Sequence, residues 1–145
     1  MSTTFAAPPT FAAAPPLPEE APRDIWTWRH PEGRLLSALV GVSALTVATA
    51  LGGPLTWTFW AGLVGPDLAF VRGWGEPVPG PGYIPRATVG LYNTLHRPWA
   101  PAVAVALGLA TLSQPLVVGG LGWLAHIALD RATGVGLRHP DGHIH

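Results

Sequence analysis

The sequence predicts an all-α integral membrane protein, a four-helix bundle built from two transmembrane hairpins. Three observations lead to this prediction. Only 16 of the 145 residues are charged, which is 11% against roughly 25% in an ordinary soluble domain. The formal net charge is zero, and the mean hydropathy is +0.32. Two stretches, 35–66 and 98–129, contain no Asp, Glu, Lys or Arg at all.

The same composition excludes several classes of protein. A nucleic-acid-binding domain needs a basic excess and a basic patch, and this chain has eight arginines balanced by eight acidic residues. The absence of cysteine excludes a disulfide scaffold and a thiolate metal cluster. The expected surroundings are therefore a lipid bilayer, and no nucleic acid is expected as a partner.

The first uncharged stretch is too long for one crossing, because about 20 apolar residues suffice to span the hydrocarbon core. It is interrupted by Gly52-Gly53-Pro54. Proline is favoured in the first turn of a helix, where its missing N–H is not needed. We therefore predict helices over 34–52 and 54–72, joined by a tight turn.

The second uncharged stretch is interrupted in the same way, at Pro115. It predicts helices over 87–113 and 115–132, the first of them continuous but kinked at Pro98 and Pro101. The alternative is that 86–97 lies flat at the membrane interface and only 98–113 crosses.

Three regions follow from this layout. Residues 1–33 form a tail rich in proline and alanine that cannot bury a core and is predicted to be disordered. The transmembrane domain covers 34–132, and a short C-terminal tail covers 133–145. All eight arginines lie before the first helix, around the connection between helices two and three, or after helix four. Cytoplasmic segments collect Arg and Lys, so both termini are expected to be cytoplasmic.

A small set of polar residues lies within or at the edges of the predicted helices, where such groups are costly and mark candidate functional sites. His126 and Asp130 are four residues apart and share a helix face, as do Tyr92 and His96. The helix directions bring the whole set to the cytoplasmic half of the bundle. Its members are Asp67, Tyr92, Asn93, His96, His126, Asp130 and Arg131.

Three interpretations of this set stay open. Two imidazoles and two carboxylates suit a divalent metal such as zinc, manganese or iron, with Asp67, His96, His126 and Asp130 as ligands. Tyr92, Asn93 and Arg131 would then be supporting polar groups. Alternatively the charges only neutralise one another, with Asp67 and Asp130 paired to arginine and the imidazoles hydrogen-bonded across helices. In the third interpretation a His–Asp pair relays protons without a metal.

Several of these residues occur in motifs that resemble an uncharacterised bacterial family of small four-helix membrane proteins, known as domain of unknown function 4260. The resemblance covers about 34 to 140 and implies a location in the bacterial inner membrane. Where the family commonly has Gly-Tyr-Gly-Leu-Lys, this chain has Val135 in place of the tyrosine and Arg138 in place of the lysine. The motifs are Pro66-Asp67-Leu68, Tyr92-Asn93-Thr94-Leu95-His96, Trp123-Leu124-Ala125-His126-Ile127-Ala128-Leu129-Asp130-Arg131 and Gly134-Val135-Gly136-Leu137-Arg138.

The order of Asp67, His96, His126 and Asp130 is also similar to that in membrane-bound metal-dependent hydrolases, whose signature is partly matched by His96-Arg97. This similarity implies a hydrolase in which a metal-activated water attacks a lipid-like substrate. The alternative is a non-catalytic structural or accessory subunit that packs against a membrane-protein partner.

Overall fold

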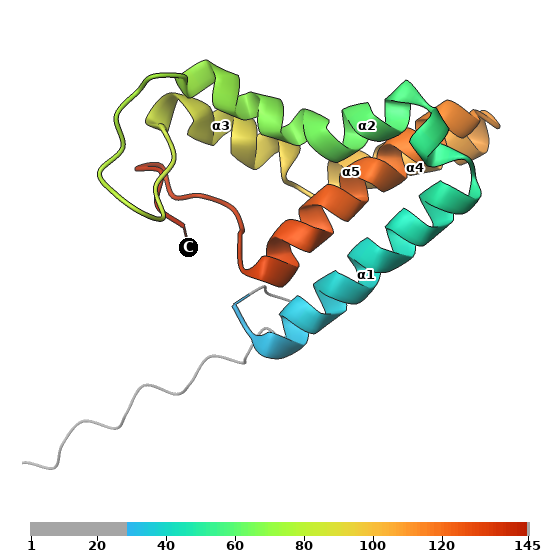
Figure 1. Ribbon diagram of the computed structural model, residues 1–145, viewed down its shortest axis with the longest axis horizontal. Coiled ribbons are helices and arrows are strands. Elements are labelled where there is room, and N and C mark those ends of the chain that lie inside the picture. Colours follow the sequence, from blue (N-terminus) through green and yellow to red (C-terminus); the bar gives the residue numbers. More distant parts are fainter. Residues whose placement is uncertain (1–28, 145) are drawn as a thin grey trace, which may run out of the picture.

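The computed structural model describes residues 29–144 and is all-α, as predicted (Figure 1). Most of the predicted N-terminal tail, 1–28, lies outside the described residues. The α-helices are α1 (Pro31–Ala50), α2 (Trp57–Val64), α3 (Arg86–Leu95), α4 (Trp99–Ala110) and α5 (Gln114–Thr133). Two 3₁₀ segments, η1 (Gly53–Leu55) and η2 (Gly65–Gly73), flank α2.

The first and last predicted helices are confirmed to within a few residues. α1 begins at Pro31, in the first turn where proline is tolerated, and Gly52 follows its end with a left-handed φ of 77°. α5 carries Pro115 in its first turn and ends where Gly134 adopts a φ of 88°. A C-terminal glycine of this kind caps the last helical carbonyl groups without steric cost.

The prediction of one α-helix over 54–72 is wrong. Pro54 lies in η1, and the Thr56 side chain then caps α2 by accepting a hydrogen bond from the Phe59 amide. At Pro66 the helix changes from α to the 3₁₀ geometry of η2. Proline lacks the N–H that would bond to the carbonyl four residues back, so the α-helical ladder stops there.

The prediction of a continuous helix over 87–113 is also wrong. α3 ends at Leu95, His96 caps it, and α4 begins at Trp99. Pro98 cannot donate to the preceding turn and disfavours helical geometry in the residue before it. The chain therefore divides as in the alternative prediction, into separate segments over 86–97 and 98–113.

α5 is the central helix, and α1, α2 and α4 all pack against it. Figure 1 shows α1 and α5 lying side by side along their lengths. Glycines make the contacts close: a Cβ atom at Gly62 of α2 would collide with the Gly119 carbonyl of α5, and one at Gly120 would lie 2.9 Å from the Val105 amide nitrogen of α4. Small residues allow helix backbones to approach in this way where lipid surrounds them.

The buried residues of α1 are all small, and most of its large ones are exposed. Its buried positions are Gly33, Gly41, Ala44 and Ala48. By contrast, Leu35 is 63% exposed and Leu39 58% exposed. Among the described helices α1 alone is both long and apolar enough to span a membrane, and 22% of its most apolar window is buried.

Gly62 offers a direct test of this packing. Gly62→Ala should lower the free energy of unfolding by about 1–3 kcal/mol, because the new methyl group has no room against Gly119. Gly90→Ala is the matched control: it adds the same methyl group to α3 where no atom lies within 4 Å. The control should be neutral or stabilising by up to about 1 kcal/mol. Denaturation of the purified protein in detergent measures both, and equal stabilities would contradict the packing described.

Candidate functional site

Two imidazoles from different helices meet at the centre of the candidate site. His96 caps the C-terminus of α3, and His126 lies in the last two turns of α5. Their Nε2 atoms are 3.1 Å apart. His96 is 3% exposed, and the His126 side chain is 10% exposed. The meeting of two buried imidazoles through the same ring nitrogen requires either a shared proton or a shared cation.

A backbone hydrogen bond determines which ring nitrogen of neutral His96 faces its partner. The Nδ1 atom lies 2.9 Å from the Tyr92 carbonyl oxygen, which can only accept. Nδ1 must therefore carry the proton, and Nε2 presents its lone pair to His126. Metal-bound histidines are commonly oriented by a hydrogen bond of this kind from the other ring nitrogen.

Two carboxylates lie beside the imidazoles. The Asp67 Oδ1 atom is 3.6 Å from His126 Nε2 and 4.0 Å from His96 Nε2. The Asp130 Oδ2 atom is 3.4 Å from His96 Nε2 and 3.7 Å from His126 Nε2. The Asp67 side chain is 49% exposed and that of Asp130 28% exposed. The site is therefore buried on its imidazole side and open on its carboxylate side.

Local chain geometry explains how these residues come together. Asp67 stands in the first turn of η2, directly after the buried Pro66, and η2 packs along α3. His126 and Asp130 are one turn apart on α5, so both face the end of α3. The four predicted ligands thus come from three elements: Asp67 from η2, His96 from the end of α3, and the pair from α5.

The donor set fits a divalent cation. Two nitrogens bound to a tetrahedral zinc ion at about 2.0–2.1 Å stand about 3.3 Å apart, close to the observed 3.1 Å. One ligand atom from each of Asp67, His96 and His126 falls within a group no wider than 4.8 Å. Three protein ligands with one position left over are typical of a catalytic zinc site. Asp130 lies outside this group of three, with its Oδ2 atom 3.4 Å and 3.7 Å from the two imidazole Nε2 atoms.

Tyr92 supports the site through its ring. The ring stacks on His96 with a centroid distance of 3.7 Å and an interplanar angle of 17°. Burial raises the pKa of Tyr92 to about 12, and the charge of Asp130 adds to the rise. The phenol is therefore neutral, and its contribution is to fix the plane of the His96 imidazole.

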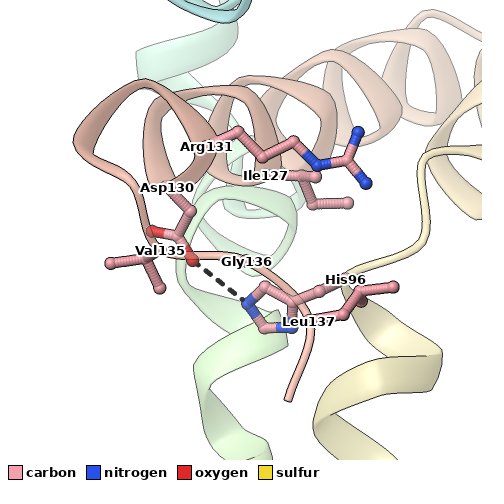
Figure 2. Close-up of a pocket in the computed structure, with 7 residues that line it drawn as sticks. All are labelled: His96, Ile127, Asp130, Arg131, Val135, Gly136 and Leu137. Atoms are coloured by element: carbon pink, nitrogen blue, oxygen red, sulfur yellow. Dashed lines mark ion pairs between the residues drawn. The ribbon is translucent and has the colours of Figure 1, made fainter. Parts of the chain in front are cut away.

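Asn93 holds the backbone of a distant segment instead of facing the imidazoles. Its side-chain amide donates to the Arg138 carbonyl oxygen and accepts from the Arg138 amide, both at 2.8 Å. Arg131 lines a small crevice together with His96 and Asp130, and Figure 2 shows its guanidinium extending away from the Asp130–His96 pair. The remaining wall of the crevice comes from the segment that follows α5, at Val135 to Leu137.

This C-terminal segment, 134–144, is a part of the site that sequence reasoning missed. It turns back after Gly134 and forms isolated bridges with itself and with the loop before α3, including Tyr83 with His143. The Arg138 guanidinium donates to the Gly82 carbonyl oxygen at 2.9 Å. Within this segment, the His143 backbone amide donates a hydrogen bond to the Asp141 carboxylate, and this bond lowers the pKa of the Asp141 carboxyl. The sequence signal was that Asn93 and Arg138 both occur in the family motifs, although in separate ones.

The fold and site define a helical protein with a His/His/Asp group able to hold a metal ion. A family model described as a domain of unknown function (DUF4260) matches residues 33–145, and the chain belongs to this family. Searches of curated proteins and of solved structures found no match.

Removal of the Asn93 amide should release the C-terminal segment. Asn93→Ala loses both hydrogen bonds to Arg138, so trypsin should cleave after Arg138 faster than in the wild type. Thr94→Ala is the control, because that hydroxyl bonds only to the Gly90 carbonyl oxygen within α3. Mass spectrometry of timed digests follows the cleavage, and equal rates in all three proteins would show that Asn93 does not hold the segment.

Proposed function

We propose that this chain is a multi-pass protein of the bacterial inner membrane that binds one divalent metal ion through His96, His126 and Asp67. The observation that carries the proposal is the 3.1 Å approach of two imidazole Nε2 atoms with two carboxylates beside them. Asp130 stands beside both imidazoles, and the fourth position of the ion stays open. Nitrogen and oxygen ligands of this kind suit zinc, manganese or iron.

The exposed surface supports the membrane part of the proposal. Large apolar side chains cover the outside of the helices, including Leu55 and Leu112, each 93% exposed, and Trp57, 79% exposed. A soluble protein rarely exposes a continuous apolar surface of this extent. α1 and α5 each have the 20 residues that a crossing requires, and α1 also has the necessary apolar composition. α4 has 12 residues and would need a locally thinned bilayer.

The reaction class that the site supports is hydrolysis. A divalent cation at this position would act as a Lewis acid toward a carbonyl or phosphoryl oxygen. The partly exposed carboxylate side, with Asp67 and Asp130, is where a substrate could approach, since the imidazole side is closed by Tyr92. A site at the edge of apolar helices favours a lipid-like substrate, as does the similarity of motif order to membrane-bound metal-dependent hydrolases.

The second candidate function is a non-catalytic accessory subunit of a membrane complex. The 3.4 Å distance between His96 Nε2 and Asp130 Oδ2 favours it, because a protonated His96 could pair directly with the carboxylate. In that case the polar groups would only stabilise the fold, and no metal would bind.

Elemental analysis of the detergent-purified protein separates these functions. The metal-binding function predicts about one equivalent of zinc, manganese or iron in the wild type and near-complete loss in His126→Ala. Asp67→Asn should also lose metal, and because that side chain is half-exposed the variant should still fold.

His139→Ala is the control, because His139 is exposed and lies outside the metal group. It should retain the full metal content. A folded wild-type protein that takes up no metal after incubation with each of the three ions would overturn the metal site. The accessory function predicts that result, together with a loss of stability in Asp67→Asn.

The topology gives a separate prediction. A fluorescent reporter fused after His145 should fluoresce, and alkaline phosphatase fused there should be inactive, because the C-terminus is expected in the cytoplasm. Truncated fusions after Gly52, in the turn that follows α1, should give the opposite pattern. Phosphatase activity at the C-terminal fusion would refute the orientation.

A further inference from the structure

A groove between α1 and α5 leads away from the metal group. Its first part, about 280 Å³, is lined by both helices and by Pro98, and it contains Ile127 and Arg131. These two residues also line the crevice that holds His96 and Asp130. The groove and the crevice are therefore neighbours that share these two residues of α5.

The groove continues along the helices. A second part, about 360 Å³, shares Val40 and Leu124 with the first and extends to Val47. Its walls are apolar apart from Ser43, and its α1 side includes the half-exposed Val40. Together the two parts form one long apolar groove that is open along α1. Their combined volume lies within the range typical of small-molecule sites.

The polar groups of the groove lie at one end. Ser37 and Arg131 line its first part, next to the metal group, and the rest of that part is apolar. An arginine guanidinium is planar and binds phosphate oxygens through paired N–H donors. Basic pockets between membrane helices at the cytoplasmic side are known to bind anionic lipid headgroups.

We propose that the α1–α5 groove binds an anionic phospholipid, with its phosphate at Arg131 and Ser37 and one acyl chain along Val40, Leu124 and Val47. This inference deepens the proposed function. Only the statement that the lipid is a substrate rests on that function. The inference identifies the substrate class as a phosphate-bearing lipid whose headgroup lies beside the Asp130–His96 end of the metal group. Binding itself requires no metal.

The test uses two probes with the same chain and different headgroups. Native mass spectrometry of the full-length protein in detergent compares oleoyl lysophosphatidic acid, which is anionic, with oleoyl lysophosphatidylcholine, which is zwitterionic. The anionic lipid should bind about tenfold more tightly to the wild type, and Arg131→Gln should abolish the difference. Arg86→Gln, an exposed arginine at the start of α3, removes the same charge outside the groove and should change nothing.

A second pair of variants tests the acyl part independently of Arg131. Val40→Trp fills the position where the two parts of the groove join, and it should weaken both lipids by about tenfold. Val42→Trp is the control, since Val42 is exposed on α1 and does not line the groove.

His126→Ala separates this proposal from the metal site. It should lose metal but keep the lipid preference, and this outcome supports both proposals. A wild-type protein that prefers the anionic lipid but takes up no metal would support the groove and refute the metal function. Equal affinity of the wild type for both lipids, or a preference that survives Arg131→Gln, would overturn the groove proposal.

Discussion

The close approach of three helices to α5 is the constraint on which the rest of the structure depends. Glycines on α5 and its partners bring backbones into contact, as between Gly62 and Gly119. Contact of small residues lets these helix backbones pack closely and holds the bundle together. This packing fixes the direction of α5 and hence the positions of His126 and Asp130.

The breaks in the helices matter as much as the helices. Pro66 changes α2 into η2 just before Asp67, and Pro98 separates α3 from α4 just after His96. Each proline thus ends an α-helix next to a predicted ligand. In the observed structure, Asp67 and His96 both lie within 4.0 Å of the α5 pair.

Much of this fold follows from the sequence, and the exceptions have physical reasons. The ends of α1 and α5 were predictable because proline and glycine mark them. The sequence predicts unbroken helices over 54–72 and 87–113, whereas both are interrupted. Hydropathy does not reveal the backbone hydrogen bonds that are lost at Pro66 and Pro98. The shared face of His126 and Asp130 follows from spacing, but the contact of His96 with His126 depends on the crossing of α3 and α5, which no local pattern encodes. The attachment of Asn93 to the Arg138 backbone was unpredictable for the same reason.

The central claim is that His96, His126 and Asp67 hold one metal ion. X-ray absorption spectroscopy of the zinc-loaded protein tests it most directly, because it reports the ligand atoms themselves. We expect two imidazole nitrogens and one or two carboxylate oxygens at about 2.0–2.2 Å in the wild type, and almost no bound zinc in His126→Ala. A shell of oxygens alone, unchanged in that variant, would contradict the central claim.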